Sequence, residues 1–199
     1  MPIGQAKFGL LGGIADLGKL ELIHTETFSS VAYVDFLVSA GTFDTSYNVH
    51  FLTINNIHSA EDNGFLGMQF YESGTLETAN VYQYAKQYGL SVGTFGVYIT
   101  TTINQIQISH AHGNATNESG GLYAYIYNAG DSSKYTFATC HSSSVNAATQ
   151  YGFEFGGGVL PQASLVNGIR IIENNRVGAG NANISGTAKL YGVKQLWVL

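Results

Sequence analysis

Charged side chains are scarce in this 199-residue sequence, in which Asp, Glu, Lys and Arg make up only 11% of the residues. Ordinary soluble domains contain roughly 25%. With eight Lys and Arg residues and a formal net charge of −5, the chain has no basic stripe that could hold a phosphate backbone. Nucleic acid is therefore excluded as a direct partner. A hydrophobic content of 45%, in repeated β-branched and aromatic runs, argues against disorder.

Cysteine, proline and long apolar runs are also rare. Cys140 is the only cysteine, which excludes an intrachain disulfide and a multi-cysteine zinc site. No apolar run approaches the roughly 18 to 20 residues that cross a bilayer, so we expect a soluble protein without a membrane partner. Proline occurs only at positions 2 and 161, and no linker or internal repeat divides the chain.

Alternation of apolar and polar residues, the pattern of a half-buried strand, recurs along most of the sequence. In one such run, Val34 and Phe36 share one face, and Tyr33 and Asp35 the other. Turn-rich clusters separate the runs, so the sequence predicts an all-β fold, an antiparallel β-sandwich of jelly-roll-like type with about ten strands. The predicted strands are 32–38, 47–54, 65–71, 97–101, 103–108, 122–127, 134–139, 150–155, 168–172 and 187–194.

Two segments depart from this pattern. Between Leu76 and Tyr88, residues Val81, Tyr84 and Tyr88 fall at helical spacing, which favours a short helix or a covering loop. Residues 1–18 contain an apolar run that is interrupted by glycines and has no clear signal-peptide cleavage site. We expect residues 1–18 to form an extended N-terminal arm and residues 19–199 to form a single β-sandwich domain.

Several glycine-rich or acidic clusters are interpreted as turns. Neither 93–96 nor 178–181 is followed by the Lys-Ser/Thr pair and the helix of a phosphate-binding loop. Residues 128–131 tolerate positive φ, and residues 61–64 lack the ordered ligand pattern of a calcium loop, so each is expected to be a turn between paired strands. Residues 156–158, a run of glycine shortly before Pro161, are expected to lie in a connection.

Candidate catalytic and metal-binding residues are few. His110 and His112 lie on the same side of an extended segment, and Glu118 could join them on a divalent metal, but a pair of polar histidines in a loop or at a strand edge is favoured. Cys140 and His141 would point to opposite faces of a strand, which favours a buried, inert thiol. We expect no catalytic residue, no metal and no cofactor, and a protein that is not an enzyme.

Tyrosine is abundant, and three of the 13 tyrosines fall on one face of a predicted strand. Tyr123, Tyr125 and Tyr127 form a row that packs into the core or a subunit interface, or that presents a contact surface for a ligand. Rigid aromatic rings supply contact area at little entropic cost, which suits either role. The sequence favours the core or interface and leaves the ligand surface open.

Five short motifs stand out at both ends and in the middle of the chain: 8–13, 28–30, 46–51, 121–128 and 185–193. Together they resemble small β-rich virion proteins of tailed bacteriophages, particularly marine and cyanobacterial ones, and the last motif is similar to the terminal strand of that group. The resemblance implies a jelly-roll-like sandwich, incorporation into the virion and symmetric oligomerisation, often as a trimer. It supplies no catalytic residue.

The apolar arm fits that implication. Phe8, Leu10, Leu11 and Ile14 cannot form a core alone but could anchor the chain on a neighbouring subunit. We expect a bacteriophage virion structural protein on the capsid or tail surface, which acts as a capsid decoration or cement protein or as a head knob or fibre. Its expected partners are its own copies, in a homotrimer, and other virion proteins such as the major capsid protein or tail proteins.

The main alternative belongs to a different functional class. A tail-fibre or receptor-binding module would recognise a host surface glycan through aromatic rings and Asn or Asp side chains. A carbohydrate-binding accessory domain of a cellular enzyme is a third, weaker hypothesis.

Overall fold

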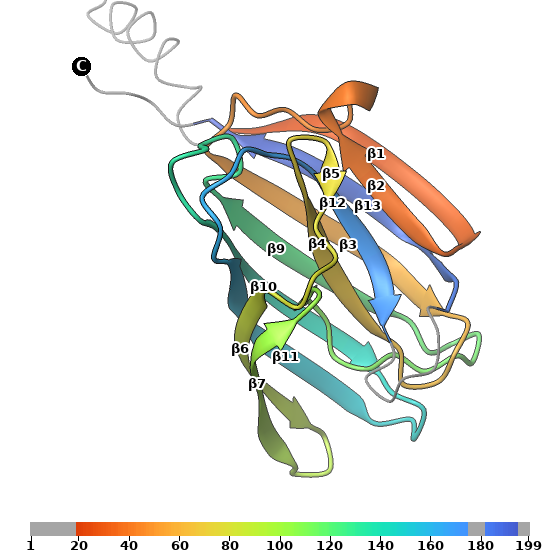
Figure 1. Cartoon of the computed structure of the whole chain (residues 1–199). Coiled ribbons are helices and arrows are strands. Elements are labelled where there is room, and N and C mark those ends of the chain that lie inside the picture. The colour runs from red at the N-terminus through yellow and green to blue at the C-terminus, as the bar shows by residue number, and fades with distance from the viewer. Residues whose placement is uncertain (1–18, 175–181, 195–199) are drawn as a thin grey trace, which may run out of the picture.

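The computed structural model describes residues 19–174 and 182–194, and it confirms the expected all-β antiparallel sandwich. A sheet of eight strands lies against a sheet of five (Figure 1). The described residues contain thirteen strands rather than about ten, and one short 3₁₀ turn, Val38–Ala40. The expected arm, 1–18, with its anchoring residues Phe8, Leu10, Leu11 and Ile14, lies outside the described residues.

The large sheet is antiparallel throughout. Its strands, in spatial order, are β1 (Leu20–Val31), β13 (Ile184–Val193), β3 (Val49–Ser59), β9 (Gly120–Tyr127), β10 (Thr136–Val145), β11 (Tyr151–Leu160), β6 (Tyr82–Leu90) and β7 (Phe95–Ile103). Strands β1 and β7 are therefore its two edges.

The small sheet covers part of the large one. Its strands, in spatial order, are β2 (Tyr33–Leu37), β12 (Val166–Asn174), β4 (Phe65–Glu72) and β5 (Thr75–Leu76), and β8 (Ile106–Gln107) pairs with β4. Apolar side chains from both sheets meet between the layers and are almost completely shielded from solvent. Those of the large sheet include Leu52, Ile54, Ala124, Ile126 and Leu190, and those of the small sheet include Phe36, Met68, Phe70, Ile169 and Ile171.

The prediction of a helix or covering loop between Leu76 and Tyr88 is wrong, because residues 82–90 form strand β6. Tyr84 and Tyr88 are four residues apart, a spacing that places them together on a helix but also on one face of a strand. Strand β1 was not predicted at all. Its pairing with β13 shifts register at two places, so its inward positions do not alternate regularly along the sequence.

Two of the four described turn predictions are confirmed. Asn128, at φ 65°, lies in the connection of the paired strands β9 and β10, and Gly93, at φ 87°, in that of β6 and β7. The turn at 61–64 instead links β3 in the large sheet to β4 in the small one, so those strands are not paired. Pro161 lies in the expected connection, between β11 and β12, but the glycines at 156–158 lie inside strand β11. Residues 178–181 lie outside the described residues.

Candidate functional site

One face of the large sheet is turned away from the small sheet and consists mainly of apolar, aromatic and small side chains. We call this surface, contributed by strands β7, β6, β11, β10, β9 and β3, the outer face. Period-two alternation places every second residue of each strand on it. Its larger apolar residues are Phe51, Phe95, Val97, Ile99, Tyr123, Tyr125, Tyr127, Phe137, Tyr151, Phe153, Phe155 and Val159.

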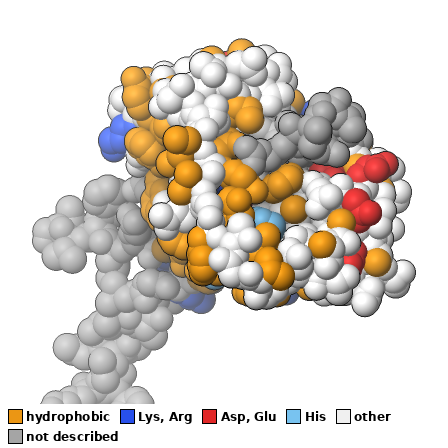
Figure 2. Space-filling view, turned by 90° about the horizontal axis from the view of Figure 1, so that it is seen from below, with side chains coloured by type: hydrophobic (Ala, Val, Ile, Leu, Met, Phe, Trp, Pro, Cys, Tyr) orange, Lys and Arg blue, Asp and Glu red, His pale blue; other side chains and the backbone are white. Residues whose placement is uncertain are grey.

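Charge is almost absent from these six strands. They contain only two Asp, Glu, Lys or Arg residues, Lys86 and Glu154, and both side chains point inward and are buried. In Figure 2 the hydrophobic side chains gather along one side of the molecule, while the acidic side chains visible in that view lie at the other side. The outer face therefore has no fixed charge with which to attract or orient a charged partner.

The tyrosine row identified in the sequence lies on the outer face. Leu122, Ala124 and Ile126 of the same strand are buried, which turns Tyr123, Tyr125 and Tyr127 toward solvent. The prediction that this row packs in the core of the sandwich is therefore wrong. The predictions that it forms a subunit interface or a ligand surface remain.

The tyrosines extend into a larger aromatic cluster. The ring centroid of Tyr125 is 4.7 Å from that of Phe51 and 6.3 Å from that of Tyr127, whose ring is stacked on it. Tyr123 packs edge-on against His141, at 5.5 Å. Contacts among the rings restrain their orientation.

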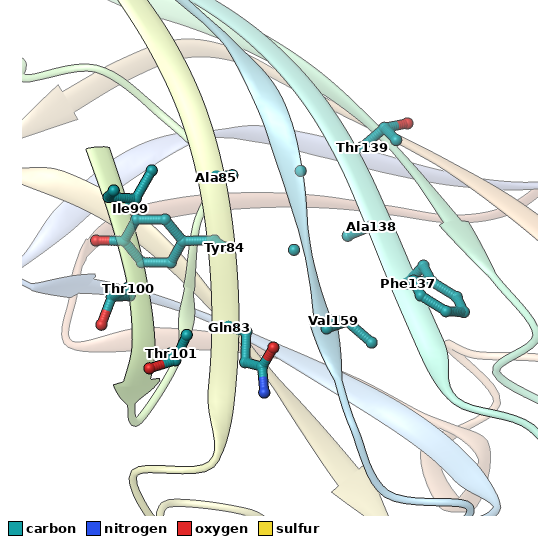
Figure 3. A pocket seen from close by; sticks show the side chains of 12 residues that line it. Gln83, Tyr84, Ala85, Ile99, Thr100, Thr101, Phe137, Ala138, Thr139 and Val159 are labelled. Carbon is teal, nitrogen blue, oxygen red and sulfur yellow. The ribbon is translucent and has the colours of Figure 1, made fainter. Parts of the chain in front are cut away.

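A shallow apolar groove of about 730 Å³ crosses the outer face beside the tyrosines. Figure 3 shows residues from four adjacent strands around it, with Ile99 of β7 on one side and Phe137 of β10 on the other. Ala85 and Gly157 are paired residues of β6 and β11, and their small size leaves the floor open between the larger side chains.

Backbone crowding explains why glycine forms part of this floor. A Cβ atom at Gly157 would lie 2.3 Å from the carbonyl oxygen of Ala138, and one at Gly158 would lie 2.5 Å from that of Gln83. Both distances are far below van der Waals contact, so a side chain at either position would displace a neighbouring strand.

The opposite side of the same strands carries a buried polar cluster. The ammonium of Lys86 forms an ion pair with Glu154, and Gln107 donates a hydrogen bond of 3.3 Å to the second carboxylate oxygen of Glu154. Gln107 also donates to the carbonyl oxygen of Ser109 at 3.0 Å. The Lys86 ammonium lies 5.1 Å from the ring centroid of Tyr84. Hydrogen bonding of this kind offsets the cost of removing the two charges from water.

His110 and His112 lie in a loop, as the sequence predicted, but both are buried. Burial lowers the pKa of His112 to about 3 and lowers that of His110, so both rings are neutral at pH 7. Glu118 does not join them: its carboxylate accepts hydrogen bonds from the Ala115 amide and the Thr149 hydroxyl. Across the ranges that the structure describes, no group of three His, Cys, Asp or Glu residues could hold a metal ion.

Cys140 is buried on the inward side of β10, and burial raises the pKa of its thiol to about 11. The thiol is therefore protonated at neutral pH and is a poor nucleophile.

Comparisons with known proteins leave the family open. No family model matches the sequence, and no curated protein matches it as a relative. Among solved structures, a protein of unknown function from Bacteroides ovatus has 8% identity and a TM-score of 0.20, covering 63% of this chain and 45% of its own. The marine PL-14 alginate lyase from Aplysia kurodai has 9% identity and a TM-score of 0.25, covering 73% and 72%. Similarity this low carries no argument about function.

No helix among the described residues is long and apolar enough to cross a membrane.

Proposed function

We propose that this protein is a structural component of a bacteriophage virion, which assembles as a symmetric oligomer by covering its outer face. The observation that carries the proposal is that six adjacent strands present aromatic and aliphatic side chains to solvent while their only two charges are buried. Contiguous exposed apolar surface of this kind typically marks an interface, because its burial is the main favourable term in association. The sequence motifs that resemble phage virion proteins are the reason for placing this oligomer in a virion.

The partner that best matches an uncharged face is another uncharged face. A charged protein surface would lose its hydration on this face without gaining a counter-charge. A second copy of the chain offers the required chemistry, as does an apolar patch on a neighbouring virion protein. The proposed sites are the capsid surface, where the protein acts as decoration or cement, and a head knob or fibre.

The test replaces two exposed outer-face residues, in the double variant Ile99→Ser/Phe155→Ser, and measures the oligomeric state by sedimentation velocity and incorporation by copurification with phage particles. We expect both association and incorporation to fall at least tenfold. Val38→Ser is the matched control, because Val38 is also exposed but lies outside the large sheet. Association and incorporation equal to the wild type would overturn the proposal.

A second candidate function, glycan recognition, is favoured by one observation. Next to the tyrosine row, a smaller hollow of about 310 Å³ is lined by Tyr123 and His141 together with the polar side chains of Thr53, Asn55 and Ser143. An aromatic ring beside amide and hydroxyl groups can stack on a sugar and bond to its hydroxyls. Glycan-array binding that is lost in Tyr123→Ala and retained in Ile99→Ser would support this function, and no binding above background would reject it.

A further inference from the structure

Strand β7 is an open edge of the large sheet. It pairs with β6 on one side, and on its other side no strand of the described chain pairs with it. In Figure 1 the β6–β7 hairpin extends away from the body at the lower end of the molecule. A row of backbone amides and carbonyls along such an edge is a template for another strand.

The hydrogen-bond pattern identifies which backbone groups are directed outward. The Leu90 amide donates to the Thr94 carbonyl at 2.8 Å, and in an antiparallel ladder every second pair from there is bonded. Residues 96, 98 and 100 thus bond to β6, whereas Phe95, Val97 and Ile99 direct their amides and carbonyls to the open side. The Ser91 amide donates to the Tyr151 carbonyl at 2.8 Å, which gives β6 the complementary alternation toward β11.

The same three residues are the most exposed large apolar residues of the outer face. Phe95 is 74% exposed, Val97 57% and Ile99 72%. Their side chains and their unpaired backbone groups therefore lie along one boundary of the molecule. Strand β7 contains no charged residue and no proline, and its pairing with β6 is regular from Phe95 to Thr100. Nothing along this stretch opposes pairing with a further strand.

The other edge of the sheet is protected. Strand β1 shifts register twice against β13, and Ser30 adopts a positive φ of 53°. It also carries charge: Glu21 is paired with Lys194 at 3.1 Å, and Glu26 with His24 at 3.1 Å. Irregular twist and charged side chains are the usual means by which proteins prevent pairing at an edge. The contrast points to β7, and not β1, as the edge that pairs.

We propose that β7 of one copy pairs antiparallel with β7 of a second copy about a two-fold axis at Val97, which joins two large sheets into one. The inference deepens the proposed function, since the partner is another copy of this chain. Val97 then lies opposite Val97 of the other copy, and Phe95 opposite Ile99. Each of these positions has outward-directed groups, so the three pairs exchange about six backbone hydrogen bonds.

The symmetric register is also favourable for the side chains. Phe95 and Ile99 become cross-strand neighbours on the outer face, and aromatic and β-branched pairs of this kind stabilise antiparallel sheets. No like charges meet across the axis, because the strand has none. The two outer faces become one continuous apolar surface, available to a further contact. Joined with a three-fold contact elsewhere, this two-fold contact would build a dihedral assembly.

Cysteine cross-linking of the full-length protein tests the register. In Val97→Cys the two symmetry-related Cα atoms would be about 5.5 Å apart, within the roughly 4.4–6.8 Å that a disulfide spans. In Phe95→Cys they would be about 14 Å apart, too far to bridge. We expect at least tenfold more disulfide-linked dimer from Val97→Cys under mild oxidation. Equal yields from the two variants would overturn the register, since Phe95 is the more exposed residue.

Charges introduced at Val97 test the pairing of the two β7 strands without oxidation. Val97→Lys and Val97→Glu each place two like charges across the axis, and we expect each variant alone to lose the contact in sedimentation velocity. An equimolar mixture of the two should restore it, because opposite charges then meet. Circular dichroism spectra that match the wild type establish that the variants fold. Variants that associate as the wild type does, or a mixture that fails to recover, would overturn the proposal.

The two proposals fail separately. Loss of association in the Phe155→Ser single variant, together with Val97 charge variants whose equimolar mixture does not regain association, would support the proposed function and reject the β7 contact. Loss of association in the Val97 charge variants, together with unchanged association in the Phe155→Ser single variant, would support the β7 contact and reject burial of the outer face.

Discussion

Two parts of the large sheet, β13–β3–β9 and β10–β11–β6, differ in the polarity of their interiors. In the half formed by β13, β3 and β9, buried residues such as Leu52, Ile126 and Leu190 pack against the small sheet. In the half formed by β10, β11 and β6, the interior holds the Lys86–Glu154 ion pair and the two buried serines Ser142 and Ser144 beside apolar residues such as Leu160, while Phe137 and Phe155 point to solvent. The interior of the first half is apolar, whereas the interior of the second half combines apolar core residues with buried charged and hydroxyl groups.

This contrast is the basis of the proposal that the second half contacts a partner. A sheet that buries charge and exposes aromatic rings gains less from folding alone than one with the usual arrangement. Under the proposed function, covering the outer face would supply the missing stabilisation. The variants below compare the two halves directly.

The largest expected effect comes from breaking the buried ion pair. Glu154→Leu leaves the Lys86 ammonium without its carboxylate in a site where both side chains are fully buried. We expect the free energy of unfolding to fall by about 3–5 kcal/mol, as is typical when one member of a buried pair is removed. Urea denaturation monitored by far-ultraviolet circular dichroism measures this free energy of unfolding.

The double variant Lys86→Met/Glu154→Leu is the control for that loss. Since apolar residues of similar volume often replace a buried pair without loss, we expect it to recover most of the stability. If the double variant is as unstable as Glu154→Leu, the loss comes from removal of the ion pair and not from the Lys86 charge that remains buried in the single variant.

A pair of truncations sharpens the comparison of the halves. Leu52→Ala creates a cavity in the ordinary core and should cost about 2–5 kcal/mol of unfolding free energy. Phe155→Ala removes a larger side chain from the outer face and should cost less than about 1 kcal/mol at protein concentrations too low for association. Urea denaturation at low and high protein concentration separates the two effects. Equal losses at low concentration would contradict the distinction between the buried core and the exposed outer face.

Acid should destabilise the fold through its buried histidines, and His112 gives a test of this effect. The pKa of His112 is lowered to about 3, chiefly by burial, and an unfolded histidine titrates near 6.5. The folded state thus binds fewer protons, so its stability is complete above pH 6.5 and declines as the pH falls toward 3. From pH 7 to pH 5 this residue should account for about 2 kcal/mol. His112→Gln should show a correspondingly shallower decline in urea midpoint over that interval.

A smaller effect of opposite sign is expected at Glu173. Burial raises the pKa of this carboxyl to about 7, above its ordinary value of 4.5. Its contribution is complete below pH 4.5 and is lost as the pH rises through 7. The stability of Glu173→Gln relative to the wild type should therefore rise by about 1 kcal/mol from pH 5.5 to pH 6.5, measured by urea denaturation. A constant difference would contradict a titrating Glu173.

Much of the fold was predictable from the sequence because period-two alternation is a local signal. Strands with an ordinary inward face, such as the one carrying Val34 and Phe36, were recognised correctly. Strand β6 was not, because its inward face carries Lys86 between two tyrosines and so hides the alternation of polarity. The turn at 61–64 was misjudged because no local pattern tells whether consecutive strands belong to one sheet or to two.

The candidate site was only partly predictable. The spacing of Tyr123, Tyr125 and Tyr127 predicted that they share one face of a strand. It did not predict that this face is turned to solvent, because the alternate residues Leu122 and Ala124 could also occur on a solvent-exposed face. The groove depends on Ile99, Ala85, Gly157 and Phe137, which come from four strands and meet only through the pairing order. The absence of charge from six strand segments was the one signal that pointed to the whole surface.

The glycines at 156–158 also determine how this surface can change over time. Added Cβ atoms there would meet the backbones of the neighbouring strands β6 and β10 at 2.3–2.5 Å, and Gly156 adopts φ 152°. A saturation mutagenesis scan should find these positions intolerant even of alanine, while Ile99 and Phe137 across the groove accept many replacements in the isolated protein. Under the proposed function, substitutions in the walls of the groove would change which partner surface fits it, whereas its glycine floor would accept almost no substitution.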